Sequence, residues 1–138
     1  MSLGRKLVVD ASVIVKRVLL EPGFEEVDRL LEAAVEGFAE LHVPSLVFKE
    51  VGNAIWRHAL RGCVKREEAP KLLRAVVELP LRVHEQDVQL LARSLEIALA
   101  CSITIYDATY VALAERLGAE LVTYDEGLKL AFKAIAKR

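Results

Sequence analysis

The most constraining feature of the sequence is residues 6–12, where an apolar run is followed by Asp10 and Ser12. Three consecutive apolar residues without polar alternation are typical of a strand covered on both faces, as parallel strands of α/β folds are. Ligands of open α/β sheets bind outside the carboxyl ends of strands, where the strand order reverses. Asp10 is therefore the first candidate functional residue. A simpler interpretation is that Asp10 and Ser12 only cap the next helix, because both types accept hydrogen bonds from free helix N–H groups.

Strand-like and helical stretches alternate along the rest of the chain. Short apolar strands are expected at 41–43, 81–83 and 120–123, and amphipathic helices at 13–20, 24–37, 46–60, 67–79, 85–100, 102–117 and 128–134. This alternation predicts an α/β fold with a parallel sheet. The length of 138 residues predicts a single domain over residues 1–138. Right-handed crossovers and one reversal of strand order would make the first and fourth strands neighbours.

The apolar content is high, at 54% of residues. It indicates a large core or an additional apolar surface that is buried in an oligomer. The two consecutive helices within residues 45–79 would form an antiparallel pair, and we expect this pair to contact a second copy or a protein partner. We therefore expect a homodimer. In the helix at 85–100, the residues expected on the buried side are Val88, Leu91, Ala92, Leu95, Ala98 and Leu99.

Charge and hydropathy exclude several functional classes. The 19 basic and 20 acidic residues nearly cancel, which argues against gripping nucleic acid through bulk charge. The local basic cluster Arg57, His58, Arg61, Lys65 and Arg66 is usually a solvated face, although it can also contact phosphates. No segment reads as a membrane span or a convincing signal peptide, so a cytoplasmic protein is expected. Two cysteines without a CxxC pair favour neither a disulfide framework nor a zinc site.

Three further carboxylates occupy positions comparable to that of Asp10. Glu50 lies in the same helix column as Leu46, so its charge is aimed along an apolar stripe, although a rim Glu commonly reaches water from such a place. Asp107 falls in the first turn of a helix, where Thr104 and Asp107 also match a loose capping box. Asp125 follows the fourth strand, where an Asp in a turn is an ordinary finding.

The predicted topology brings these four carboxylates to one edge of the sheet. Two unit charges about 4 Å apart repel by ~4 kcal/mol at an effective dielectric of ~20. That energy equals roughly three pKa units, so the four groups cannot all remain ionised alone. Protons or a divalent cation must neutralise them, and a cluster of carboxylate oxygens without His or Cys suits Mg²⁺ or Mn²⁺.

Four stretches of the chain resemble the PIN-domain nucleases, in particular VapC-type toxins. They are residues 8–12 (VVDAS), 44–54 (PSLVFKEVGNA), 106–114 (YDATYVALA) and 121–125 (LVTYD). The likeness covers nearly the whole chain and depends on the order and spacing of the stretches together with the total length. It implies a three-layer α/β/α sandwich whose central parallel sheet has four to five strands in the order 3-2-1-4-5. It further implies that Asp10, Glu50, Asp107 and Asp125 form the catalytic and metal-binding quartet, with Ser12 as a supporting hydroxyl.

The resemblance implies an Mg²⁺- or Mn²⁺-dependent endoribonuclease with RNA as substrate and an antitoxin protein as partner. Two alternatives stay open. In a receiver or phosphotransferase domain Asp10 would be the nucleophile, but no second Asp stands at the position of Ser12 and no Lys follows a strand as a receiver requires. In a non-catalytic PIN-like binding module the acidic pocket would remain without turnover.

Overall fold

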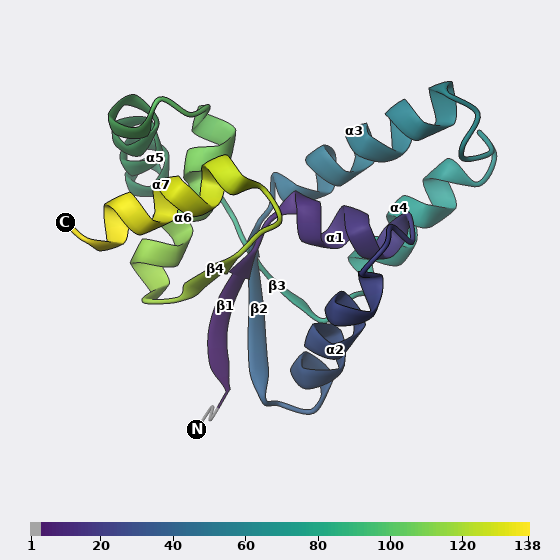
Figure 1. Ribbon diagram of the computed structural model, residues 1–138, viewed down its shortest axis with the longest axis horizontal. Coiled ribbons are helices and arrows are strands. Elements are labelled where there is room, and N and C mark those ends of the chain that lie inside the picture. Colours follow the sequence, from purple (N-terminus) through teal and green to yellow (C-terminus); the bar gives the residue numbers. More distant parts are fainter. Residues whose placement is uncertain (1–3) are drawn as a thin grey trace.

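A four-stranded parallel sheet forms the centre of the computed structural model, which describes residues 4–138 (Figure 1). The strands are β1 (Arg5–Val9), β2 (Ala39–Pro44), β3 (Leu81–His84) and β4 (Glu120–Val122), in the order β3-β2-β1-β4. All three pairings are parallel. The predicted α/β class and the order of four strands are confirmed. β1 and β4 are neighbours, so their carboxyl ends lie at the point where the strand order reverses.

Within residues 4–138 the sheet has four strands, the lower of the two numbers expected, and no fifth strand follows β4. The residues after β4 form a helix that continues to Ala136. This segment has buried Leu128, Ala131 and Ile135 at helical spacing, and a helix is the conformation that buries such a pattern on one face. The single-domain expectation for residues 1–138 includes residues 1–3, which lie outside the described residues.

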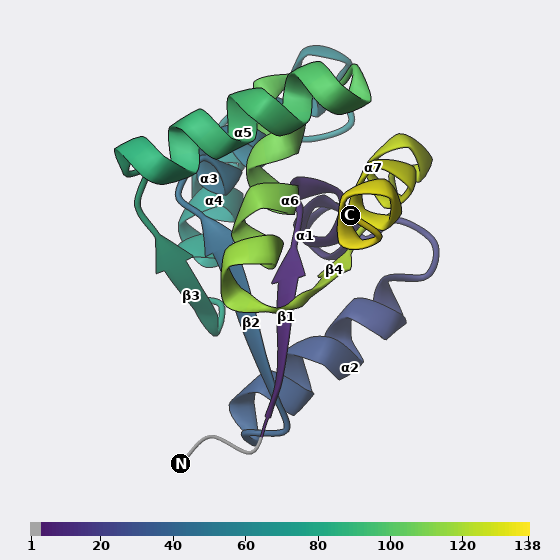
Figure 2. The same ribbon diagram turned by 90° about the vertical axis from the view of Figure 1, so that its left-hand side faces the viewer.

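Seven helices within the described residues cover the two faces of the sheet. They are α1 (Ala11–Val18), α2 (Phe24–Val35), α3 (Val47–Leu60), α4 (Ala69–Val77), α5 (Val88–Cys101), α6 (Ile105–Leu117) and α7 (Glu126–Ala136). Helices α5 to α7 lie on one side of the sheet and α1 to α4 on the other (Figures 1 and 2). Helices α3 and α4 pack against each other as an arm that extends away from the sheet. The expected helix pair is thus present.

Helix α6 is the central element of the core. It contacts β1, β2 and β4 on one side and packs against α5 and α7 on others (Figure 2). Its residues 108–114 are all buried, so the helix is surrounded by protein rather than amphipathic. Leu7, Val8 and Val9 of β1 are each at most 2% exposed, as expected for a strand covered on both faces. Asp10 therefore follows a buried stretch of β1, and Asp107 precedes the buried stretch of α6.

The orientation of α5 differs from the prediction. Of the residues expected to be buried, Ala98 is buried, but Ala92 is exposed, and Val88, Leu91, Leu95 and Leu99 are between 48% and 78% exposed. The residues that face the core are Leu90, Ser94, Ile97 and Ala98. Ser94 is tolerated there because its hydroxyl donates to the Leu90 carbonyl at 2.7 Å. The helix carries two overlapping apolar stripes, and its contact with α6 decides which stripe is buried.

Polar contacts between α5 and α6 fit this orientation. Arg93 forms a two-pronged ion pair with Glu115, with both nitrogen–oxygen distances at 2.8 Å. Arg116 pairs with Asp87, which also caps α5 by accepting the Leu90 N–H at 2.7 Å. No single helix of residues 4–138 is long and apolar enough to cross a membrane. Helices α5 and α6 pass that test only together, with a bend of 113° between them.

A buried polar network lies between β2 and β3. His42 of β2 is only 6% exposed. Its Nε2 lies 3.0 Å from Oε1 of Glu40, and its Nδ1 lies 2.8 Å from Nε2 of His84. Burial, followed by the charges of His42 and Arg116, lowers the pKa of His84. These contacts satisfy polar groups that would otherwise be costly at the sheet's interior.

Candidate active site

Asp10 stands at the carboxyl end of β1, where it is the N-cap residue of α1. It is only 6% exposed. Both carboxylate oxygens accept hydrogen bonds from hydroxyls: Ser12 Oγ donates to Oδ1 at 2.6 Å and Thr123 Oγ1 donates to Oδ2 at 2.7 Å. Burial raises the pKa of Asp10, the hydroxyls partly oppose this rise, and the charge of Asp125 adds to it. Asp10 is therefore a buried, oriented carboxylate rather than a simple helix cap.

The two hydroxyls also connect the ends of β1 and β4. Ser12 Oγ accepts the backbone N–H of Tyr124 at 3.0 Å, and Thr123 Oγ1 accepts that of Asp125 at 3.0 Å. Each hydroxyl thus donates to Asp10 while accepting from the segment that follows β4. Because both are used as donor and acceptor, their rotation is restrained. Ser12 has the supporting place that the resemblance implies, and Thr123 is a partner that the sequence analysis missed.

Glu50 projects from α3 toward α6. The buried hydroxyl of Tyr110, in a side chain 1% exposed, donates to its Oε1 at 2.5 Å. Burial raises the pKa of Glu50, the Tyr110 hydrogen bond lowers it, and the charges of Asp107 and Asp10 raise it further. Burial also raises the pKa of the Tyr110 phenol, followed by the effect of Glu50, so Tyr110 remains a donor. Glu50 is therefore held inside the site instead of reaching bulk water from its rim.

Asp107 lies in the first turn of α6, but its carboxylate is not the cap of that helix. The cap is Thr104, whose hydroxyl accepts the Asp107 N–H at 3.1 Å. Within residues 4–138 the Asp107 carboxylate makes no hydrogen bond or ion pair. Burial raises the pKa of Asp107, and the charges of Asp125 and Asp10 add to the rise. The capping box is therefore only half formed, which leaves the Asp107 carboxylate free to face the other acids.

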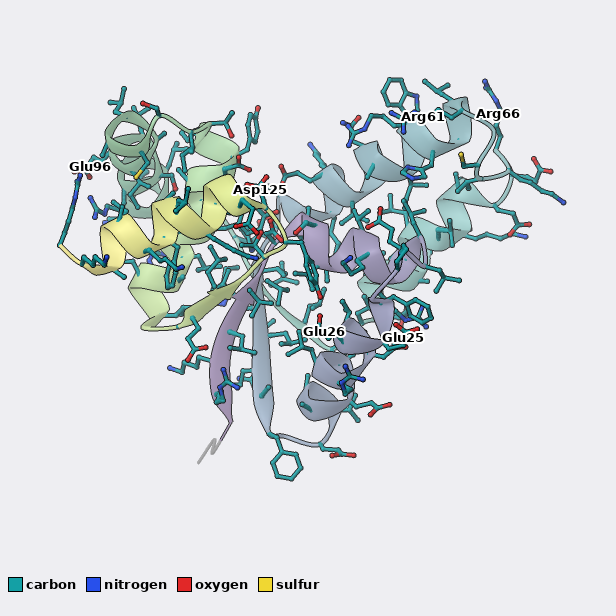
Figure 3. All side chains as sticks on the ribbon, viewed as in Figure 1. Glu25, Glu26, Arg61, Arg66, Glu96 and Asp125 are labelled. Carbon is teal, nitrogen blue, oxygen red and sulfur yellow. The ribbon has the colours of Figure 1, made fainter. Side chains whose placement is uncertain are left out.

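Asp125 follows β4 and opens α7. Its Oδ1 accepts the Leu128 N–H at 2.9 Å, so it caps the helix as well as lying beside Asp10 and Asp107. Asp125 lies above the strand ends, where α7 begins (Figure 3). A carboxylate at a helix N-terminus is stabilised by the helix dipole. One Asp125 oxygen thus caps α7, and the other is available to a ligand.

The structure brings all four sequence-predicted carboxylates together. The charge of Asp125 contributes to the raised pKa of Asp10. The charges of Asp107 and Asp10 contribute to that of Glu50, and the charges of Asp125 and Asp10 to that of Asp107. They come from four separate elements: β1, α3, α6 and the turn before α7. Burial is the main cause of the raised pKa values of Asp10, Glu50 and Asp107, and the charges of neighbouring carboxylates add to each rise. A cation or protons would relieve the repulsion between these charges.

These acids fit a hard divalent cation that keeps part of its water shell. Among residues 4–138, no three His, Cys, Asp or Glu side chains are placed so that together they could hold a metal ion as a ready-made cage. Mg²⁺ does not need such a cage, because it commonly binds through one or two carboxylates and retains several waters. Asp10 and Asp125 each keep carboxylate lone pairs beyond their hydrogen bonds, since an ionised carboxylate can accept about four.

Tyr110 and Thr123 are the site residues that sequence reasoning missed. Tyr110 follows Asp107 by three residues and therefore lies on a neighbouring part of the same helix face. Thr123 immediately precedes the loop that carries Asp125. Both positions carry a hydroxyl in otherwise apolar surroundings, which is a signal in retrospect. Their partners, Glu50 and Asp10, are far away in sequence, so the pairing itself was not visible.

Comparison with known proteins places this site in a family context. Residues 7–136 match the PIN domain. The chain is 39% identical over 132 residues to Ribonuclease VapC3 of Pyrobaculum aerophilum, an alignment that covers 94% of this chain and 97% of the relative. It is 37% identical over 93 residues to Exonuclease VapC9 of the same organism, covering 67% of this chain and 65% of that protein.

Solved structures show the same architecture. The crystal structure of PAE2754 from Pyrobaculum aerophilum superposes with a TM-score of 0.73 and 26% identity, covering 99% of this chain and 97% of the other. Mycobacterium tuberculosis VapC20, described as a Sarcin-Ricin loop cleaving toxin, superposes with a TM-score of 0.69. Its identity is 15%, with 91% of this chain and 94% of that chain covered, so this likeness concerns the fold alone.

The separation of cap and carboxylate at the start of α6 predicts opposite effects of two neighbouring substitutions. Asp107→Asn removes a charge whose pKa is raised, so it should increase the melting temperature of the metal-free protein at neutral pH. Thr104→Ala removes the cap and should cost about 1 kcal/mol of unfolding free energy. Thermal denaturation of both variants without metal tests this. If Asp107→Asn is the more destabilised of the two, Asp107 is a structural residue and not a member of the acidic cluster.

The raised pKa of Asp107 determines how the stability of the metal-free protein depends on pH. A carboxyl with a raised pKa binds more protons in the folded than in the unfolded state between its two pKa values. Metal-free stability should therefore decrease as pH rises from the ordinary Asp pKa through this window. The dependence should be shallower in Asp107→Asn than in the unsubstituted protein.

The buried bond between Tyr110 and Glu50 predicts a loss that depends on one hydroxyl. Tyr110→Phe keeps the ring but leaves the half-buried Glu50 without its donor, and should cost about 1.5 kcal/mol of unfolding free energy. Tyr106→Phe is the matched control, because Tyr106 lies one turn earlier on α6 and is 61% exposed. Chemical denaturation measures both. Equal stability of the two variants would show that the bond contributes nothing.

Proposed function

The chain belongs to the PIN-domain family, and from that premise we propose that it is a VapC-like toxin: a divalent-metal-dependent endoribonuclease that hydrolyses RNA phosphodiester bonds. The observation that carries the proposal is the convergence of Asp10, Glu50, Asp107 and Asp125 from four elements at the strand ends, with raised pKa values at three of them. The name of the similar Ribonuclease VapC3 supports the reaction class. In this proposal residues 1–138 act as one domain, in the cytoplasm.

The acidic quartet would hold Mg²⁺ or Mn²⁺. Asp10 and Asp125 are the proposed direct ligands, while Glu50 and Asp107 complete the shell or orient the attacking water. When bound, the cation supplies a positive charge that lowers the pKa of water, orients the phosphate and stabilises charge on the leaving oxygen. The chain lacks His and Cys at this place, and its all-oxygen donor set suits a hard cation.

The surrounding donors make the acidic groups rigid. Ser12 and Thr123 hold the two Asp10 oxygens, so this carboxylate cannot rotate without breaking a hydrogen bond. Tyr110 holds Glu50 through a hydrogen bond to Oε1. Groups that are oriented before substrate binds need little reorganisation during the reaction. These residues position the proposed ligands and are not themselves reactive groups.

The nucleophilic alternative for Asp10 has less support. A nucleophilic carboxylate needs an oxygen that can reach phosphorus, whereas both Asp10 oxygens accept short hydrogen bonds and the residue is 6% exposed. The role of an oriented metal ligand agrees better with this environment. The non-catalytic binding module is separated from an enzyme by the cleavage assay below.

The proposed partners are an RNA substrate, an antitoxin protein and a second copy of the chain. Exposed apolar side chains support the protein contacts. On the α3–α4 arm they include Trp56, Leu60 and Val77, and on α5 they are Val88, Leu91, Leu95 and Leu99. Such clusters on a surface commonly mark protein interfaces.

We expect Mn²⁺ or Mg²⁺ to stabilise the protein and to support RNA cleavage. At a concentration a hundredfold above its dissociation constant, the cation should add ~2.7 kcal/mol to the unfolding free energy. Asp125→Asn should abolish most of this gain, and Asp10→Asn should abolish cleavage. Glu126→Gln is the matched control, because Glu126 is the next residue, is exposed and pairs with Lys129 at 3.1 Å.

Differential scanning calorimetry with and without Mn²⁺, together with a gel assay on a mixed-sequence RNA, gives both readouts. Metal stabilisation without cleavage, in all substrates tested, would favour the binding module. An unchanged melting temperature at saturating Mn²⁺, with no heat of binding, would remove the metal site.

We expect self-association that weakens when an exposed apolar patch is made polar. Leu95→Glu tests the α5 face and Trp56→Ser tests the α3–α4 arm, since both side chains are more than half exposed. Sedimentation velocity over a concentration series should show that one of these variants shifts the protein toward monomer. A strictly monomeric unsubstituted protein at high concentration contradicts the proposed homodimer.

A further inference from the structure

A groove of about 400 Å³ opens beside the acidic site, between α1 and α3. One wall carries Ser12 and Lys16 from α1 and Glu21 from the turn after it, and the other carries Glu50, Asn53 and Arg57 from α3. These α3 residues recur at three- and four-residue steps, so they form a single stripe along the helix. The ring of Tyr124, which follows β4, closes the groove. Its volume lies within the range of small-molecule sites and is far too small for a nucleic-acid duplex.

The groove changes from acidic to basic along its length. Ser12 and Glu50 belong to the acidic end, where they touch the proposed quartet. Lys16 lies one helical turn from Ser12 and Arg57 two turns from Glu50, which correspond to about 6 and 10 Å along the helices. Beyond the groove, Arg61 and Arg66 continue the basic surface to the end of the α3–α4 arm (Figure 3).

Glu21 adds one carboxylate to the groove near Lys16, but among the described residues it forms no ion pair with Lys16 or Arg57. In the described part of the chain the exposed Arg57 guanidinium has no ion pair or hydrogen bond, and the Asn53 amide likewise has no partner. Lys16 Nζ donates to the Pro22 carbonyl at 2.9 Å and lies 4.3 Å from the centre of the Tyr124 ring. Two cations, an unused amide and a partly exposed aromatic ring thus line one groove. This combination matches a phosphate joined to a planar base.

We propose that this groove binds the nucleotide next to the cleaved phosphodiester of a single-stranded RNA. Lys16 and Arg57 contact its phosphate, the base stacks on Tyr124, and the Asn53 amide hydrogen-bonds to the base or ribose. The inference rests on the proposed function, which it extends by assigning a substrate subsite. Single strands are recognised by stacking on aromatic rings and by cationic grooves, whereas duplexes are bound across much wider surfaces.

Binding of a fluorescent single-stranded RNA of about twelve nucleotides tests the subsite. The full chain carries Asp10→Asn to prevent cleavage, and anisotropy is measured with Mn²⁺ at several salt concentrations. Arg57→Gln and Lys16→Gln should each weaken binding about fivefold or more and reduce the slope of log K against log salt by about 0.7. Tyr124→Leu should weaken binding about tenfold, whereas Tyr124→Phe keeps the ring and should bind normally.

Arg61→Gln is the matched control for charge, because Arg61 lies one turn beyond Arg57 on the same arm but outside the groove. It should change affinity by less than twofold. Equal losses in Arg57→Gln and Arg61→Gln would overturn the subsite and indicate a diffuse basic surface. Loss of poly-glutamate binding in Arg57→Gln, with RNA affinity unchanged, would also overturn it by assigning the groove to an acidic protein.

The failure of this inference is distinguishable from failure of the proposed function. With Asp10 restored, Mn²⁺ stabilisation should be unchanged in Arg57→Gln, because Arg57 is not placed among the metal ligands. If the unsubstituted protein cleaves RNA while the groove variants bind RNA normally, the subsite is wrong and the function stands. If groove variants lose RNA affinity as expected but the unsubstituted protein cleaves no RNA, the subsite stands and the nuclease assignment is wrong.

Discussion

Repulsion among four carboxylates at the carboxyl end of the sheet is the constraint on which the rest of the structure depends. Asp10 is held there by β1, and Asp107 by α6, and both elements contribute buried residues to the core. A charged cluster at such a place opposes folding unless other interactions keep it in position. The apolar packing of α6 against the sheet and against α5 provides that support. Apolar packing next to the site therefore offsets the cost of the clustered charge, and that charge remains available to a cation.

Polar donors around the cluster add direction to this support. Ser12, Thr123 and Tyr110 each donate to one carboxylate, and each comes from a different part of the chain. Ser12 and Thr123 also accept backbone N–H groups after β4, so the same atoms that orient Asp10 place Asp125. A site built this way is stiff because breaking one contact disturbs two strands. Asp125 also has two roles, because one of its oxygens caps α7.

The α3–α4 arm connects this chemistry to recognition. Glu50 at its base is part of the acidic cluster, and Arg57 two turns later is unpaired among the described residues. One helix thus carries negative charge at its base and positive charge two turns later, at a separation that its rise fixes. Under the proposed function, this arrangement would let a chain of net charge −1 bind RNA. The relevant quantity is the local distribution of charge, because screening confines the influence of exposed charges to about 10 Å.

Sequence alone determined the α/β class, the order of four strands and the four carboxylates, because these depend on local apolar patterns, chain polarity and the rule that parallel strand ends share one edge. It could not decide which stripe of α5 is buried, since Val88 and Leu91 lie on a stripe as apolar as that of Leu90 and Ile97, and only contact with α6 distinguishes them. The absence of a fifth strand likewise followed from packing of α7. Tyr110 and Thr123 acquired their roles through partners 60 and 113 positions away. Local periodicity does not indicate such long-range pairs. Only the tertiary structure therefore showed which hydroxyls donate to the carboxylates.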